Sequence, residues 1–318
     1  MKEYYHGKRE IDTFAAKEYF MNVEEQVNSF HRDGFIKLPD LIGPQELQTL
    51  QADTQKIVDS PFEGIEDEID YFADLDPETD ETIFHRVQYI FPKSSTSPNS
   101  LVCLLVHPEI LTIVDALLGN QFLCEAEALV FKTPGNGRAV PVHADCDPAD
   151  SRTSDAHLSF NVDIYLDEAN PENGCLMVAP GSHQRRENPQ QIGQQGFNYP
   201  SLEPMPMKAG DVLIHNVRLV HGSHQNNSDQ LRRTIYFEFQ SIPWMIKEGI
   251  RPGYPVNSAW LEDRVRLLLY AIEERKKCSY TREETSFEYQ VSDSFNLEPL
   301  RFDKKVNLRP KLGYNKFF

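Results

Sequence analysis

The stretch RRTIYFEFQ, residues 232–240, alternates between two kinds of side chain, as a β-strand does when its two faces meet different surroundings. One face would carry Arg232, Thr234, Tyr236 and Glu238, and the other Arg233, Ile235, Phe237 and Phe239. Strand-like segments also occur at residues 123–132, 158–166, 176–179 and 211–216. Short strands separated by turns rich in glycine, proline and asparagine predict a mainly β barrel or jelly roll over residues 122–240.

Helices are expected on both sides of this β region. Apolar residues recur at helical spacing in a segment that starts at Asn22 and runs into a short strand ending near Ile36, and again in residues 44–57, 108–118 and 258–277. Residues 1–121 are therefore expected to be mainly helical, and residues 241–318 to form a C-terminal extension with one helix. Because no linker-like segment interrupts the chain, we expect residues 1–318 to form a single domain.

Two segments are expected to be loops. Residues 63–82 contain ten acidic side chains and no lysine or arginine. Residues 184–207 are rich in glutamine, asparagine and proline and have no clear period. A solvated loop explains the acidic segment most simply, and a lid over a cationic substrate is the alternative.

The composition excludes several classes of protein. A net charge of −17 argues against a nucleic-acid partner, because such proteins present basic faces. No apolar run approaches the roughly 18 residues that a membrane span needs, and the first residues do not form a secretory signal. Five cysteines without a C-x-x-C spacing predict free thiols. We expect a cytoplasmic protein, monomeric or homodimeric, that acts on a small molecule.

Two imidazoles and one carboxylate form the ligand set that holds iron(II) and leaves coordination positions open. The pattern of a histidine followed two residues later by an acid occurs at His31, His107 and His143, but only His143-Ala144-Asp145 lies among the predicted strands. Residues two apart in an extended segment point the same way, so both side chains can reach one ion. The residues alone leave the second histidine open among His157, His183, His215, His221 and His224. His221 is placed at a strand end, whereas His215 is expected to be a packed strand residue.

Arg232 is the candidate for binding an organic carboxylate. A guanidinium beside the hydroxyl of Thr234 suits a carboxylate inside a barrel, and a surface salt bridge is the plainer alternative. On the segment 158–166, Asn161 and Asp163 share one face and are candidates to line the same cavity, although ordinary strand amphipathicity also explains their alternation.

Residues 30–240 resemble the phytanoyl-CoA dioxygenase family of iron(II)- and 2-oxoglutarate-dependent oxygenases. The resemblance is carried by FHRDGF (30–35), HAD (143–145), NGCL (173–176), PGSH (180–183), GDVL (210–213) and HGS (221–223), followed by Arg232. Their order and spacing together are far more specific than any single motif.

The resemblance implies a double-stranded β-helix, the jelly-roll fold of cupin-like proteins, and a cofactor site within it. His143, Asp145 and His221 match the iron ligands, and Arg232 matches the arginine that holds the far carboxylate of 2-oxoglutarate. Thr234 and Lys132 fall where relatives place further contacts to this co-substrate. Asn161, which could line the same cavity, is also expected to bind the cofactor.

The reaction implied is hydroxylation of a small metabolite with consumption of O2 and release of succinate and CO2. Halogenating relatives lack the acidic ligand, so Asp145 disfavours halogenation. Desaturation, cyclisation and epimerisation use the same ligands and stay open. The rivals from other classes are a non-catalytic jelly-roll binding or sensor protein and a zinc hydrolase that uses the same three ligands.

Overall fold

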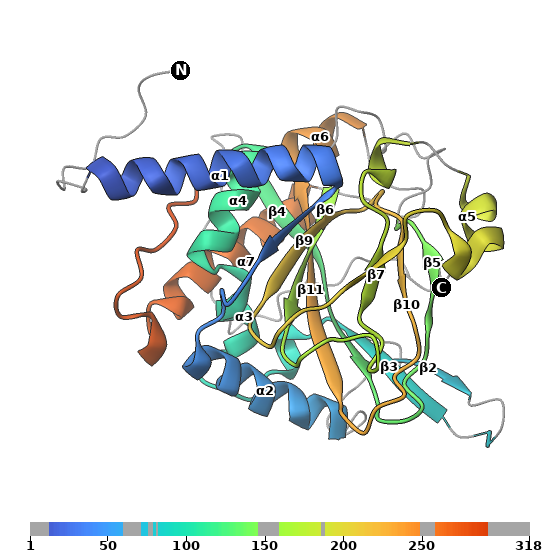
Figure 1. Cartoon of the computed structure of the whole chain (residues 1–318). Coiled ribbons are helices and arrows are strands. Elements are labelled where there is room, and N and C mark those ends of the chain that lie inside the picture. Colours follow the sequence, from blue (N-terminus) through green and yellow to red (C-terminus); the bar gives the residue numbers. More distant parts are fainter. Residues whose placement is uncertain are drawn as a thin grey trace.

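The computed structural model describes residues 13–59, 71–75, 79–80, 82–145, 159–185, 188–248 and 258–291. Two antiparallel sheets form the centre of the molecule, and helices cover the outer face of the larger one (Figure 1). The larger sheet has the order β1-β9-β6-β11-β4-β3-β2, and the smaller one β5-β10-β7-β8. This arrangement confirms the double-stranded β-helix predicted from the sequence.

The strands of the larger sheet are β1 (Phe35–Leu38), β2 (Tyr71–Leu75), β3 (Thr82–Gln88), β4 (Phe122–Lys132), β6 (Ser159–Tyr165), β9 (Val212–Asn216) and β11 (Arg232–Ser241). Those of the smaller sheet are β5 (Val140–His143), β7 (Leu176–Val178), β8 (Glu203–Met205) and β10 (His221–Ser223). The helices are α1 (Thr13–Asp33), α2 (Pro44–Asp59), α3 (Ser100–Leu105), α4 (Pro108–Leu118), α5 (Pro189–Gln195), α6 (Ile242–Glu248) and α7 (Ser258–Arg275).

Strand β11 lies at the middle of the larger sheet, between β6 and β4. Its apolar face, with Ile235, Phe237 and Phe239 fully buried, packs in the main hydrophobic core beside residues of α3, α4 and α7. Its other face looks into the space between the two sheets, where Asp145, just after β5, and His221 of β10 meet side chains of β6 and β9. The alternation in residues 232–240 therefore predicted both faces correctly.

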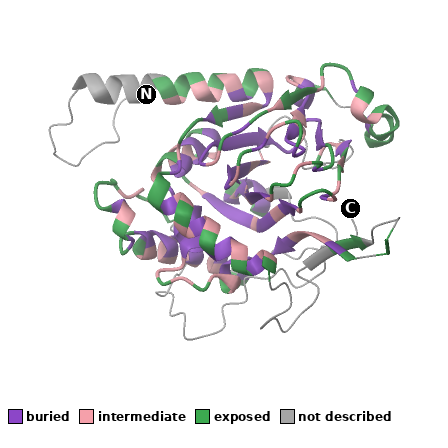
Figure 2. Cartoon of the chain, turned by 60° about the horizontal axis from the view of Figure 1, so that its bottom comes forward, coloured by how far each residue is buried: buried purple, intermediate pink, exposed green. Residues whose placement is uncertain are grey.

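Helices α3, α4 and α7 close this hydrophobic core on the outer side of the larger sheet. Helix α4 begins at Pro108, whose missing N–H costs nothing in the first turn, and Asn99 caps α3 by accepting a hydrogen bond from the Val102 amide. Helix α7 is pinned to β4 by a fully buried ion pair between Arg264 and Glu127, 2.9 Å apart. Figure 2 shows buried residues concentrated in the sheets and on the helix faces against them.

Several elements depart from the expected pattern. Helix α1 runs into the short strand β1 as expected, through Gly34, whose φ of +90° other residues avoid; the unexpected strands are β2 and β3, which widen the larger sheet within the part expected to be mainly helical. Residues 71–75, expected in a loop, form β2; much of the remaining 63–82 segment lies outside the described residues.

The segment 184–207 is not irregular throughout, contrary to expectation. It contains α5 and the edge strand β8. Helix α5 is capped by the Asn188 side chain and exposes almost every residue except Ile192, so it has no apolar stripe that a sequence pattern could reveal. Among the described residues, no helix is long and apolar enough to cross a bilayer.

Candidate active site

His143, Asp145 and His221 converge between the two sheets. His143 ends β5 and His221 begins β10, and the two residues are partners in the antiparallel pairing of these strands. Asp145 Oδ1 lies 3.3 Å from His143 Nε2 and 3.7 Å from His221 Nε2. One ligand atom from each residue lies within 4.8 Å of the other two, which is the proximity that a shared metal ion requires.

Backbone carbonyl groups fix the orientation of both imidazoles. His143 Nδ1 lies 2.7 Å from the carbonyl oxygen of Pro141, and His221 Nδ1 lies 2.8 Å from that of Leu219. Because a carbonyl can only accept, each Nδ1 carries the proton and donates it. The Nε2 lone pairs are thus left facing Asp145, which is the state that a metal-binding histidine needs.

The charges within this group favour a carboxylate ligand. Burial opposes ionisation of Asp145, but the surrounding imidazoles of His221, His143 and His215 hold the pKa of Asp145 well below its ordinary value. Burial lowers the pKa of His221 to about 3, so this imidazole is neutral at physiological pH. The side chains of His143 and Asp145 are 23% and 21% exposed, so the group is open to solvent on one side.

The second oxygen of Asp145 is held from the larger sheet. Asn161 Nδ2 donates to Asp145 Oδ2 at 3.0 Å, and His215 Nε2 lies 3.4 Å from the same oxygen. Asn161, expected to bind the cofactor, is thus placed against Asp145. His215 is fully packed in its strand as expected, but it also reaches this site and lies 3.0 Å from Asp163. The sequence signal for this contact was the polar residues on the inner faces of otherwise apolar strands.

Arg232 and Thr234 form a second polar group on the inner face of β11. Arg232 is 3% exposed and Thr234 is fully buried. Arg232 donates from Nη1 to the carbonyl of Gly174, while its Nε and the Thr234 hydroxyl have no hydrogen-bond partner in the described part of the chain. Buried donors without partners are costly, and a carboxylate would satisfy both of them.

Lys132 of β4 is the cross-strand partner of Arg232 in the neighbouring strand β11. Its amino group donates to the carbonyl oxygens of Arg138 at 2.6 Å and His224 at 2.5 Å, so the backbone takes up both N–H donors of the neutral amine. Burial and the neighbouring Arg232 charge lower the pKa of Lys132 to about 6. Lys132 therefore lies beside the candidate carboxylate site, where protonation would give it a third donor.

Arg233 has a different environment from Arg232. It points away from the space between the sheets and pairs with Asp167 at 2.8 Å, and its Nη1 donates to the Gln51 carbonyl in α2. All three donor nitrogens of its guanidinium are thus used within the protein. Of the two adjacent arginines, only Arg232 lies on the inner face.

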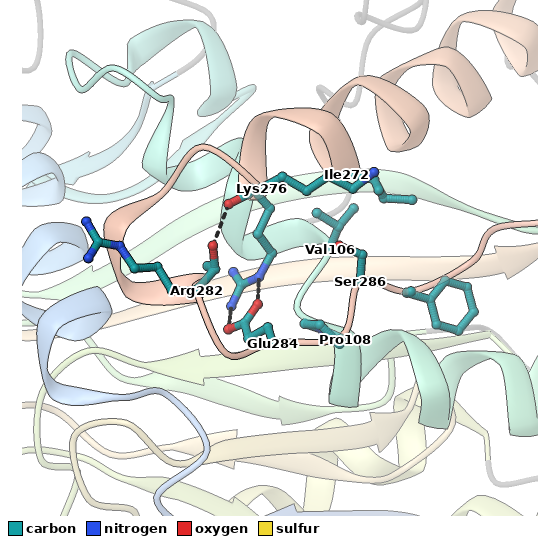
Figure 3. Close-up of a pocket in the computed structure, with 10 residues that line it drawn as sticks. Val106, Pro108, Ile272, Lys276, Arg282, Glu284 and Ser286 are labelled. Atoms are coloured by element: carbon teal, nitrogen blue, oxygen red, sulfur yellow. Dashed lines mark hydrogen bonds and ion pairs between the residues drawn. The ribbon is translucent and has the colours of Figure 1, made fainter. Parts of the chain in front are cut away.

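Another cluster of potential ligands lies in the helical layer. Ligand atoms of Glu46, His107 and Glu284 lie within 4.8 Å of one another. Arg275 already bridges the two carboxylates, at 2.7 Å from each. A cavity of about 220 Å³ lies beside Glu284 (Figure 3). Because the guanidinium already pairs with both carboxylates, the cluster suits an internal ion-pair network better than a metal ion. His107 occupies the N-cap position of α4, where its side chain makes no capping hydrogen bond.

The comparisons with known proteins agree with this geometry. Residues 30–234 match the phytanoyl-CoA dioxygenase (PhyH) family. The methylphosphonate hydroxylase of Gimesia maris is 27% identical over 223 residues, which cover 69% of this chain and 81% of that protein.

Two solved structures show how far the fold is shared. The crystal structure of AviO1 from Streptomyces viridochromogenes is 28% identical, with a TM-score of 0.58 over 72% of this chain and 96% of that one. The alpha ketoglutarate dependent carbocyclase SnoK from nogalamycin biosynthesis, at 22% identity, shares the fold with a TM-score of 0.55 over 74% of this chain and 93% of that one. The chain belongs to the phytanoyl-CoA dioxygenase family of Fe(II)- and 2-oxoglutarate-dependent oxygenases.

Proposed function

We propose that His143, Asp145 and His221 hold the iron, that Arg232 and Thr234 bind the far carboxylate of 2-oxoglutarate, and that the enzyme hydroxylates a small-molecule metabolite. The observation that carries the proposal is the orientation of the two imidazoles. Both Nδ1 atoms are held by backbone carbonyls, and both Nε2 atoms face the same carboxylate oxygen. Two imidazole nitrogens and one carboxylate oxygen fit iron(II), which accepts this mixed ligand set.

The residues around the ligands have distinct tasks. Arg232 contributes a permanent charge and two-pronged geometry in a place closed to water, where a charge-assisted hydrogen bond is stronger than at the surface. Thr234 adds a hydroxyl that has no other partner among the described residues. Asn161 holds Asp145 by its second oxygen. Lys132 lies next to Arg232, and a carboxylate bound there would favour its charged ammonium form.

Iron and 2-oxoglutarate held in this way would supply O2-dependent oxidation of a substrate C–H bond, with release of succinate and CO2. The substrate can approach from the side where His143 and Asp145 are exposed. The protein's own part is to fix the ligands, to orient the co-substrate and to limit access of water. The presence of Asp145 favours hydroxylation over halogenation.

The test begins with anaerobic addition of Fe(II) and 2-oxoglutarate to the apoprotein. We expect a visible charge-transfer absorption band, and after admission of O2 a release of succinate that an accepted substrate stimulates. A panel of small metabolites, analysed for oxygenated, desaturated, cyclised and epimerised products, then identifies the outcome. If no band forms and 2-oxoglutarate does not bind, a zinc hydrolase or a binding protein becomes the better explanation.

A further inference from the structure

A row of polar side chains lies behind Asp145, on the inner face of the larger sheet. Asn161 and Asp163 belong to β6, and His215 belongs to β9, where it is the cross-strand partner of Asn161. The residues that alternate with them, including Val162 and Ile214, are fully buried in the main hydrophobic core. The polar row therefore faces the site and not the helical layer.

Distances connect this row to one oxygen of Asp145. Asp163 Oδ2 lies 3.0 Å from His215 Nδ1, and His215 Nε2 lies 3.4 Å from Asp145 Oδ2. Asn161 donates to the same Oδ2 at 3.0 Å. The other oxygen, Oδ1, is the one nearest to His143 and His221. The two oxygens of Asp145 thus have separate neighbours.

The Asp163–His215 pair is poorly explained as a source of stability. Asp163 is fully buried and His215 is 1% exposed, and within the described residues neither has a well-aligned hydrogen bond to any other group. A buried ion pair recovers little more than the cost of removing its charges from water, and apolar residues of similar size often serve stability as well or better. A role at the neighbouring site accounts for the pair more directly.

We propose that Asp163 and His215 are positioning residues for Asp145, an inference that rests on the proposed function of Asp145 as an iron ligand. Asp163 fixes the ring of His215, and His215 together with Asn161 occupies Oδ2. Asp145 is thereby held with Oδ1 toward the two ligand histidines, so that it binds the metal through one oxygen. Outer partners of this kind orient a ligand before the metal arrives.

His215 is distinct from the ligands themselves. The group whose ligand atoms lie within 4.8 Å of one another comprises His143, Asp145 and His221. Both nitrogens of His215 face carboxylate oxygens, Nδ1 that of Asp163 and Nε2 the outer oxygen of Asp145. Its contact with the metal is therefore indirect.

The test uses the double variant Asp163→Leu/His215→Phe in the full chain. Removing both charges and filling the space with apolar groups should leave the metal-free protein at least as resistant to thermal unfolding as the wild type. The dissociation constant for Fe(II), measured anaerobically by calorimetry, should rise about 10- to 100-fold. The charge-transfer band of the Fe(II)–2-oxoglutarate complex should also shift, because a differently oriented carboxylate changes the field at the metal.

Two further variants separate positioning from general damage. His215→Asn keeps an amide that can face Asp163 but cannot reach Asp145, and it should weaken Fe(II) binding as the double variant does, even if that variant does not fold. Asp163→Asn keeps an oxygen acceptor for the His215 ring and should retain most of the wild-type affinity for Fe(II). His107→Phe is the matched control, since His107 is also buried with an unpartnered Nδ1 among the described residues but lies by Arg275.

The outcomes distinguish this inference from the proposed function. If the wild type binds Fe(II) and a folded double variant or His215→Asn binds it equally well, the positioning role is refuted and the iron site stands. If the wild type binds no Fe(II), or if His143→Ala binds it as well as the wild type does, the proposed iron site fails and the inference fails with it.

Discussion

His143 and His221 are partners across the antiparallel pairing of β5 and β10, with their ring centroids 4.4 Å apart. Their pairing brings two distant segments of the chain to one point and places Asp145 beside both. We therefore expect His143→Ala and Asp145→Ala each to abolish Fe(II)-dependent succinate formation, because two ligands cannot hold the metal in the geometry that three define. Anaerobic Fe(II) titration and a succinate assay measure this.

A matched control is available for these ligand substitutions. His31 and Asp33 repeat the same spacing at the end of α1, where Asp33 pairs with Arg32. His31→Ala should leave Fe(II) binding and succinate formation unchanged. Full activity in Asp145→Ala would show that the iron is held elsewhere.

The adjacent arginines of β11 allow a paired test of the co-substrate site. Arg232→Ala should raise the apparent KM for 2-oxoglutarate about 10- to 100-fold, because a hydrogen bond to a charged group is worth about 1.5–3 kcal/mol. Arg233→Ala should instead lower the stability of the fold, since it breaks the contacts with Asp167 and α2. Steady-state succinate kinetics and urea unfolding, applied to both variants, measure the two effects.

The reverse pattern would contradict this assignment. An unchanged KM in Arg232→Ala, together with a raised KM in a stably folded Arg233→Ala, would place the anchor on the opposite face of the strand. Arg232 and Arg233 have different contacts within the protein, so the two variants are informative as a pair.

The sequence could predict the long central strands better than the short elements at the surface. The alternation in residues 232–240 follows from the two-residue period of a strand, so both faces of β11 were predictable. Helix α5 and strand β8 were not, because short polar elements at the surface have neither an apolar stripe nor strict alternation. Their position depends on contacts with the smaller sheet, such as that of Ile192.

The same limit applies within the site. The spacing of His143 and Asp145 is local, so a strand prediction placed them together. The choice of His221 over His215 depended on family resemblance, because both histidines follow apolar runs. The contact between His215 and Asp163 joins two strands that are distant in sequence, and the pairing of β6 with β9 that creates it is visible only in the folded chain. Asp163 was foreseen as a lining residue, but its partner was not.

If 2-oxoglutarate binds at Arg232 as proposed, Lys132 should make this binding sensitive to protonation. Burial and the Arg232 charge lower its pKa from 10.5 to about 6, so between these values the unfolded chain binds more protons than the folded one. The Lys132 contribution therefore makes the apoprotein more stable as pH rises from about 6 to about 10.5. A carboxylate bound at Arg232 favours the ammonium form, so 2-oxoglutarate binding at pH 7.5 should take up protons.

Calorimetry in two buffers of different ionisation enthalpy measures this uptake. The observed binding enthalpy should depend on the buffer in the wild type, and the dependence should largely disappear in Lys132→Met, whose side chain fills similar space without a charge. Buffer-independent enthalpies in the wild type would show that Lys132 keeps its protonation state when 2-oxoglutarate binds.

The ion pair between Arg264 and Glu127 predicts how firmly α7 is held on β4. Both side chains are fully buried, and Arg264 Nε also donates to the Cys124 carbonyl at 2.6 Å. Arg264→Met should lower the free energy of unfolding by about 3–5 kcal/mol, because Glu127 keeps its charge without the guanidinium. On the same helix, Arg266 pairs with Glu262 and Asp263 while partly exposed, and Arg266→Met should cost less than about 1 kcal/mol.

A second substitution identifies the source of that loss. Arg264→Met/Glu127→Leu removes both charges and should recover most of the stability in urea unfolding. Succinate formation per folded molecule should be unchanged in all three variants, because Glu127 lies on the face of β4 that meets the helices and not on the face that meets the site. A double variant as unstable as Arg264→Met alone would mean that Arg264 stabilises α7 through its packing and its bond to Cys124, with little contribution from the charge of Glu127.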